Sequence, residues 1–142
     1  MQKMSIQAPL YTVIAIDRGE GVSTPAAFAA LDGMYADFDG SVPFRTATDA
    51  EIIEAFTAKS PDFRACLYNA FEAAILPKCP SAMRIKEQMA EAGAIATMMS
   101  GSGPSVFGIF DSEAQARAVA IDLNGNDRIR AFFAVATPPL CD

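Results

Sequence analysis

Two short apolar runs joined by the tetrapeptide Gly101-Ser102-Gly103-Pro104 constrain the fold of this chain most strongly. The runs cover residues 94–99 and 105–110, and turn-forming residues bound both of them, as is usual for strands. A short Gly- and Ser-rich stretch between two apolar runs is typical of a β-hairpin. The pattern therefore predicts an antiparallel pair of strands, around which the other elements must be arranged.

Two further strands are predicted over 10–16 and 129–137 from their β-branched and aromatic residues. Helices are expected where apolar residues recur at helical spacing behind capping or proline signals, over 24–35, 48–56, 60–76, 80–93 and 112–123. Strands and helices do not alternate strictly, so a doubly wound parallel sheet is not expected. We predict an α+β fold in which a four-stranded, mostly antiparallel sheet carries helices on one face, close to the ferredoxin-like split βαβ motif.

Length and charge limit the kind of protein this can be. No repeat or linker divides the 142 residues, so we expect a single domain over residues 1–142. The net charge of −6 argues against nucleic acid or an anionic membrane as a partner, because both need clustered Lys and Arg. No apolar stretch is as long as a membrane span, and none follows the first residues as in a secretion signal. A cytoplasmic location is expected.

The chain contains no histidine, which excludes Ser-His-Asp and Cys-His catalysis and histidine-based metal sites. The three cysteines, Cys66, Cys79 and Cys141, lie far apart and lack zinc-site spacing, as expected of free thiols in a reducing compartment. The carboxylates are scattered along the sequence. We therefore predict no metal site, no acid–base pair and no catalytic residue in this chain.

The stretch Ser100, Gly101, Ser102, Gly103 and Pro104 is the strongest candidate for a binding loop. Two glycines one residue apart permit positive φ angles and close approach of a ligand. Successive backbone N–H groups, with serine hydroxyls beside them, can form an anion-binding concavity without any lysine. The alternative is a plain hairpin turn, and the local sequence does not decide between the two.

Ser23 and Thr24 form a second candidate, because they lie at a strand-to-helix junction and helix N-termini favour anions. The alternative is that Thr24 simply caps the helix. Asn69 is a third candidate, since an asparagine inside the predicted helix over 60–76 suggests a polar contact. A solvent-facing Asn69 is equally compatible with the sequence.

The residues from Ser100 to Phe110, which read Ser-Gly-Ser-Gly-Pro-Ser-Val-Phe-Gly-Ile-Phe, resemble the third motif of the GHMP kinases. That superfamily includes galactokinase, homoserine kinase and mevalonate kinase. The stretches 21–24, 68–72 and 85–94 are similar to the branch that phosphorylates 4-diphosphocytidyl-2-C-methyl-D-erythritol in non-mevalonate isoprenoid biosynthesis. The resemblance runs from Tyr11 to Pro138 and covers only the C-terminal half of such an enzyme.

The resemblance implies the C-terminal domain of an ATP-dependent small-molecule kinase, without the N-terminal ATP-binding domain and its reacting Asp and Lys. It implies that residues 100–104 line the active-site cleft and that Ser23, Thr24 and Asn69 lie near substrate or at the domain interface. ATP and Mg²⁺ are implied for the intact enzyme, with neither held tightly by this chain. The expected partners are the N-terminal domain, the small-molecule substrate and a second copy of the chain.

We expect the isolated chain to have no kinase activity, whether it is a shortened piece of a longer enzyme or a natural stand-alone module. Two alternatives stay open at this point. One is a non-catalytic ligand-binding or regulatory module of ferredoxin-like shape. The other is the C-terminal domain of a different GHMP kinase, of the homoserine or mevalonate type.

Overall fold

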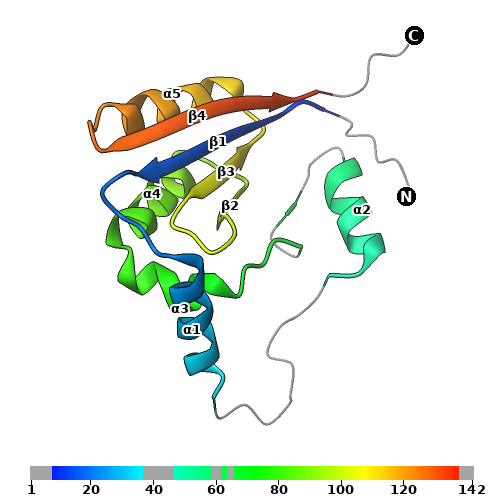
Figure 1. Cartoon of the computed structure of the whole chain (residues 1–142). Coiled ribbons are helices and arrows are strands. Elements are labelled where there is room, and N and C mark those ends of the chain that lie inside the picture. The colour runs from blue at the N-terminus through cyan, green and yellow to red at the C-terminus, as the bar shows by residue number, and fades with distance from the viewer. Residues whose placement is uncertain (1–7, 37–46, 59–61, 64–65, 138–142) are drawn as a thin grey trace.

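The computed structural model describes residues 8–36, 47–58, 62–63 and 66–137 of the chain. The described residues form four strands, five α-helices and a short 3-10 helix, η1, after α3. Figure 1 shows how the strands and α-helices are arranged. Their bounds are β1 Leu10–Asp17, α1 Thr24–Met34, α2 Asp49–Thr57, α3 Phe71–Ile75, η1 Leu76–Lys78, α4 Pro80–Glu91, β2 Ala96–Met99, β3 Val106–Phe110, α5 Glu113–Asn124 and β4 Ile129–Ala136. None of the described helices is long and apolar enough to cross a bilayer.

The four strands form one sheet in the order β2-β3-β1-β4, and every neighbouring pair is antiparallel. The first strand, β1, is therefore central and pairs with both β3 and β4. In the register, Ile14 lies between Phe107 of β3 and Phe132 of β4. The predicted α+β class, the four-stranded sheet and the hairpin over 94–110 are confirmed.

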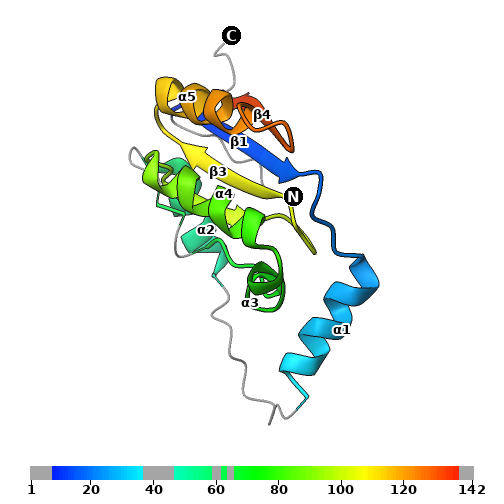
Figure 2. The same cartoon turned by 90° about the vertical axis from the view of Figure 1, so that its left-hand side faces the viewer.

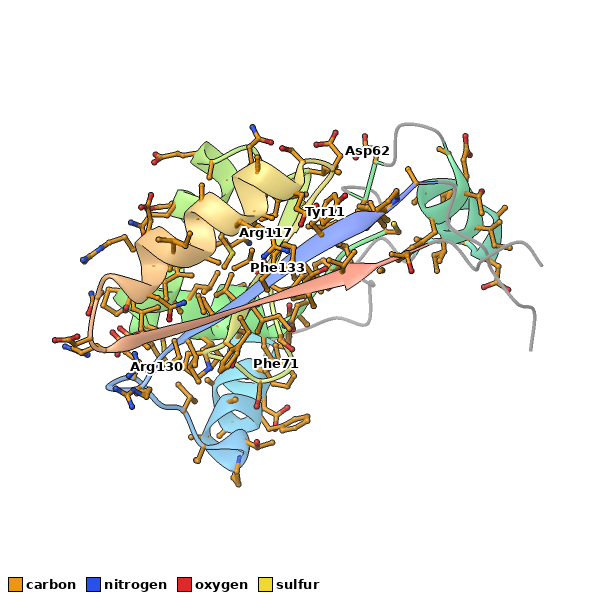
Figure 3. The ribbon with its side chains drawn as sticks, turned by 90° about the horizontal axis from the view of Figure 1, so that it is seen from above. Tyr11, Asp62, Phe71, Arg117, Arg130 and Phe133 are labelled. Carbon is orange, nitrogen blue, oxygen red and sulfur yellow. The ribbon has the colours of Figure 1, made fainter. Side chains whose placement is uncertain are left out.

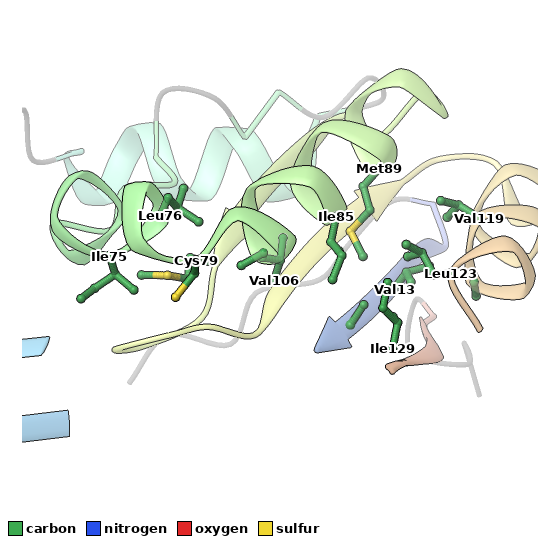
Figure 4. Packing of buried hydrophobic residues seen from close by; sticks show 14 of the residues in the cluster. Val13, Ile75, Leu76, Cys79, Ile85, Met89, Val106, Val119, Leu123 and Ile129 are labelled. Carbon is green, nitrogen blue, oxygen red and sulfur yellow. The ribbon is translucent and has the colours of Figure 1, made fainter. Parts of the chain in front are cut away.

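Helices α4 and α5 cover one face of the sheet, as the two views in Figures 1 and 2 show. Alternate side chains of the central strands point to this face and are buried. Figure 4 shows how they meet the inner faces of the two helices. The main contributors to this cluster are Val13, Val106, Phe110, Ile85, Met89, Val119 and Leu123.

Among the residues that the structure describes, the opposite sheet face is covered at one end only. Leu10 and Ile109 point to this side and pack with Ala55 of α2 and with Phe63 in a second, smaller cluster. Away from α2, the face carries Ile14, which is 43% exposed, and Phe132, which is 65% exposed. The sheet therefore has one fully packed face and one face with an exposed apolar part.

Helix α5 is held against the edge strand β4 by a contact between a cation and an aromatic ring. The guanidinium of Arg117 lies 4.2 Å from the centroid of the Phe133 ring, which in turn stacks on Tyr11 at 6.1 Å. Figure 3 shows these three side chains side by side above the sheet. Because β4 has a neighbour on one side only, this contact adds a second restraint to the edge.

The helix predicted over 60–76 is wrong in its described part before Phe71. Residues 59–61 and 64–65 lie outside the described residues, and residues 66–70 form an irregular turn, so that α3 begins only at Phe71. The cause is Asn69, whose side-chain oxygen accepts the N–H of Phe71 at 3.0 Å. Asparagine competes in this way with regular helical bonding, and a helix then begins after it.

Replacing Phe110 with Ala tests the main cluster. The side chain is fully buried, so we expect the free energy of unfolding to fall by about 3–5 kcal/mol. Urea titration followed by circular dichroism measures the change. The matched control is Phe132→Ala, which removes an exposed ring from the same sheet and is expected to cost less than about 1 kcal/mol. Equal losses in the two variants would contradict this account of the core.

Candidate functional site

The loop between β2 and β3, residues 100–104, is here called the glycine loop. Gly101 and Gly103 have φ angles of +57° and +79°, in the left-handed region that favours glycine, and the Gly103–Pro104 peptide is cis. The N–H of Ser100 donates to Ser105 O at 2.8 Å, and the N–H of Gly103 donates to Ser100 O at 3.1 Å. The loop is therefore a hairpin connection with a defined, internally bonded shape.

Two backbone donors of the glycine loop are left over. Within the described part of the chain, the N–H groups of Gly101 and Ser102 donate no hydrogen bond. Gly101 is exposed and Ser102 is half-buried, so solvent or a ligand can reach the loop. Free, neighbouring N–H groups are the donors that an anion-binding concavity needs.

Helix α1 begins at the glycine loop. The hydroxyls of Thr24, the first helical residue, and Ser102 lie 3.3 Å apart. Ser23 precedes the helix and its hydroxyl accepts the N–H of Ala26 at 3.3 Å, so that Ser23, and not Thr24, is the N-cap. The structure thus brings together two candidates that are 78 residues apart in the sequence.

Helix α1 projects from the body of the fold in Figure 2, and its first turns hold it in place. Ala27 is fully buried, and the ring of Phe28 meets the ring of Phe71 edge-on with centroids 5.0 Å apart. The contact ties α1 to α3, where Phe71 is labelled in Figure 3. The N-terminus of α1 is therefore fixed beside the glycine loop by packing as well as by the hydroxyl pair.

A buried carboxylate fixes the connection from β1 to α1. Asp17 is 5% exposed and accepts hydrogen bonds from Gly19 N at 2.7 Å, Ser81 Oγ at 2.8 Å and Arg128 Nε at 3.2 Å. The N–H of Gly19 lowers the pKa of Asp17 most, burial opposes it, and Ser81 and Arg128 lower the pKa further. Asp17 is thus held in its charged form where the chain leaves the sheet.

Glu20 continues the same connection and caps α4. Its two carboxylate oxygens accept the N–H groups of Ser81 at 2.8 Å and Ala82 at 3.1 Å, the first free donors of that helix. The residue before the helix, Cys79, provides no side-chain cap. Burial raises the pKa of the Cys79 thiol, and the nearby Glu20 charge raises it further. Two acidic side chains of the loop therefore dock it onto α4.

Asn69 lies in the turn before α3 and touches the glycine loop. Its Nδ2 donates to Met99 O at 2.7 Å and to Gly101 O at 2.8 Å. Glu72 follows one turn later and accepts Met99 N at 2.7 Å as well as Lys86 Nζ at 2.7 Å. The solvent-facing alternative for Asn69 does not hold, and a direct contact of Asn69 with substrate stays a prediction.

Sequence reasoning missed Asp17, Glu20 and Glu72. The sequence did hold one usable signal, because α4 begins with Cys79-Pro80-Ser81 and has no capping side chain of its own, so a cap had to come from elsewhere. The sequence does not say which of its many carboxylates supplies that cap.

The donors at the glycine loop suit a phosphate better than a metal ion. Two free N–H groups, two hydroxyls and the N-terminus of α1 meet there, and all can donate to anionic oxygens. Within the residues that the structure describes, no group of three acidic or cysteine side chains could hold a metal ion. The ammonium of Lys86 is bound to both carboxylate oxygens of Glu72.

Comparison with known families connects this geometry to a known group of enzymes. The family model described as GHMP kinases C terminal matches residues 50–126, which is more than half of the chain. The match includes the whole glycine loop, the strands on either side of it and the Asn69–Glu72 segment. The predicted resemblance to the GHMP kinases is confirmed.

Among curated relatives, the 4-diphosphocytidyl-2-C-methyl-D-erythritol kinase of Acaryochloris marina is 33% identical over 124 residues, which are 80% of this chain and 39% of that protein. The kinase of the same name from Gloeobacter violaceus is 33% identical over 123 residues, 87% of this chain and 40% of that protein. The chain thus spans about two fifths of the length of these relatives.

A crystal structure of 4-(cytidine 5'-diphospho)-2C-methyl-D-erythritol kinase has the same fold. It superimposes with a TM-score of 0.69 at 23% identity, and the match covers 96% of this chain and 46% of that chain.

Replacing Asp17 with Asn should change how stability depends on pH. The folded-state pKa of Asp17 is lowered, so its stabilising effect is present above the ordinary carboxyl pKa and is lost as pH falls through the folded-state pKa. We expect Asp17→Asn to be less stable than the original at neutral pH and to lose less stability on acidification. Urea titrations between pH 7 and pH 3 compare the slopes, and equal slopes would contradict the assignment.

Alanine at Gly103 should destabilise the chain more than alanine at Gly101. Both positions have positive φ, which costs an alanine about 1–2 kcal/mol. At Gly103 the added Cβ would also lie 2.5 Å from the Sδ of the fully buried Met99, whereas nothing lies within 4 Å at Gly101. Thermal unfolding of the two variants makes the comparison, and a larger loss for Gly101→Ala would show that steric contact does not shape this loop.

Proposed function

The chain belongs to the GHMP kinases as their C-terminal domain, and from this membership we propose that it forms the C-terminal half of a 4-diphosphocytidyl-2-C-methyl-D-erythritol kinase. The observation that carries the proposal is the 33% identity over 80% of this chain to a kinase of that name. The reaction is the ATP-dependent phosphorylation of a hydroxyl group of the sugar-alcohol part of the substrate. The homoserine and mevalonate types are less favoured, because the curated relatives described above carry the cytidyl kinase name.

The glycine loop is proposed to donate backbone N–H groups to phosphate oxygens in the active-site cleft. The free N–H groups of Gly101 and Ser102, with the hydroxyls of Ser102 and Thr24, support this role. Phosphoryl transfer depends on positioning and on stabilisation of negative charge, and backbone donors supply both without adding a titrating group. Serine hydroxyls and N–H groups remain donors over the whole physiological pH range.

ATP and Mg²⁺ are proposed as the co-substrate and metal of the intact enzyme. Residues outside this chain are expected to hold Mg²⁺ and to act on the reacting hydroxyl, since the described residues offer phosphate donors and no acidic cluster. Mg²⁺ would neutralise charge on the transferred phosphoryl group. Within this chain, the residues around the glycine loop bind and orient, and none of them is proposed to move a proton.

The proposed partner is the N-terminal half of a kinase, which would supply the remaining three fifths of the length seen in the relatives. A cytoplasmic location agrees with the free thiols of Cys66 and Cys79. A second copy of the chain as partner stays a prediction.

A chimera tests the proposed function. This chain replaces the matching C-terminal segment of the Gloeobacter violaceus kinase, and phosphorylation of 4-diphosphocytidyl-2-C-methyl-D-erythritol is measured with ATP and Mg²⁺. We expect the chimera to be active, the isolated 142-residue chain to be inactive, and Gly103→Ala in the chimera to lower kcat/KM at least about tenfold, because the donors of the loop move.

The control is Phe132→Ala in the same chimera, which removes an exposed side chain on another part of the sheet and is expected to leave kcat/KM nearly unchanged. A folded chimera without activity would contradict the proposed function and would favour the non-catalytic module. Activity of the isolated chain would show that the chemistry does not need a second half.

A further inference from the structure

The edge strand β2 pairs with β3 on one side, and among the described residues side chains hold the end of its other side. Strand β2 lies at the edge of the sheet, and Met99 is its last residue. The N–H of Met99 donates to Glu72 Oε1 at 2.7 Å, and its C=O accepts Asn69 Nδ2 at 2.7 Å. Both backbone groups of Met99 are thus satisfied by side chains, one from Asn69 in the turn before α3 and one from Glu72 in the first turn of α3, in the way that a neighbouring strand would satisfy them.

Asn69 extends this hold into the glycine loop itself. Its second Nδ2 hydrogen donates to Gly101 O at 2.8 Å, while its Oδ1 accepts Phe71 N at 3.0 Å. Both donors of the amide and its oxygen are therefore used by the chain's own backbone. Glu72 is fixed in turn, because each of its oxygens also accepts Lys86 Nζ at 2.7 Å.

The bond to Gly101 O has a geometric consequence for the next N–H group. The peptide between Gly101 and Ser102 is planar and trans, so its C=O and N–H point in opposite directions. With the C=O of Gly101 directed at Asn69, the N–H of Ser102 is directed away from Asn69. That N–H is one of the two free donors of the loop.

We infer that Asn69 is a positioning residue of the glycine loop, which sets the direction of the Ser102 N–H by holding the carbonyls of Met99 and Gly101. The inference rests on the proposed function in one respect only, the identification of that N–H as a phosphate donor. Asn69 contacts no ligand in this account and acts through the peptide that it holds.

A second asparagine provides a matched control. Asn124 at the end of α5 makes the same three kinds of hydrogen bond, with Nδ2 donating to Ala120 O and Ala131 O at 2.9 Å each and Oδ1 accepting Ala131 N at 3.1 Å. The two bonds with Ala131 join α5 to β4, the bond to Ala120 lies within α5, and none of the three reaches the glycine loop. Asn124 therefore matches Asn69 in bonding and differs from it in location.

The experiment compares Asn69→Asp and Asn124→Asp in the 142-residue chain. Each substitution keeps the size of the side chain and replaces an NH₂ donor with a carboxylate oxygen facing two carbonyl oxygens. Circular dichroism and urea titration first measure folding, which both substitutions are expected to weaken. Residual dipolar couplings and ¹⁵N relaxation then report the direction and order of the Ser102 N–H.

For Asn69→Asp we expect the couplings of Ser102 and Gly103 to change and the order parameter of Ser102 to fall from about 0.85 to below about 0.6. For Asn124→Asp we expect the couplings of Ser102 and Gly103 and the order parameter of Ser102 to stay at their original values. A folded Asn69→Asp protein with an unchanged Ser102 N–H, or equal changes in the two variants, would overturn the inference.

A measurement on the unsubstituted chain covers the case in which Asn69→Asp does not fold. Scalar couplings across hydrogen bonds, from Asn69 Nδ2 to the carbonyl carbons of Met99 and Gly101, are expected to be detectable, and a folded chain without them would overturn the inference. Titration with inorganic phosphate, followed at the Ser102 N–H, tests the proposed function separately. Failure of phosphate to bind the original chain would contradict the phosphate-donor role and leave the positioning result as measured.

Discussion

The whole arrangement depends on the pairing of β1 with two strands from the far end of the chain. Because β1 is central, it pairs both with β3, which follows the glycine loop, and with β4, and its inward side chains lie in the main buried cluster. The same pairing places Asp17, the last residue of β1, opposite Ile129 and within reach of Arg128. The hydrogen bond from Ser81 to the buried Asp17 carboxylate holds the end of β1 against α4, and α1 then begins beside the glycine loop. The position of the candidate site is thus a consequence of strand order.

Much of the fold could be predicted from short patterns, because it depends on short-range chemistry. β-Branched and aromatic residues mark β1 and β4, and the Gly101–Pro104 stretch marks the hairpin, since a positive φ at two nearby positions needs glycine. The helix predicted over 60–76 is wrong before Phe71, where the Asn69 side chain accepts the N–H of Phe71 and also donates to backbone 30 and 32 residues away. A pattern of apolar spacing carries no information about such a partner.

The candidate site also has a part that local sequence patterns predict and a part that they do not. Residues 100–104 and Ser23 with Thr24 could be chosen from sequence because glycines and capping residues have local meanings. The 3.3 Å distance between the hydroxyls of Thr24 and Ser102 could not be predicted, since it depends on where α1 begins after the loop that Asp17 and Glu20 hold. The sequence singled out Asn69 as a candidate but predicted it inside a helix, whereas it lies in the turn before α3. Glu72 was not identified, because a glutamate inside the predicted helix over 60–76 has an ordinary explanation as part of a solvated acidic surface.

The acidic composition of the chain has a different meaning once the contacts are known. Asp17, Glu20 and Glu72 direct their charges at Arg128, at the N-terminus of α4 and at Lys86, so these three carboxylates are satisfied inside the domain. All three are bound to α4 or to the strand ends around it, and none is bound to the N–H groups of the glycine loop. The net charge of −6 does not by itself exclude an anion at the loop, because none of these three carboxylates is bound to the N–H groups of the loop and two of them are paired with a cation. The loop keeps neutral donors, while the ion pairs and the helix cap next to it are made by residues outside the loop.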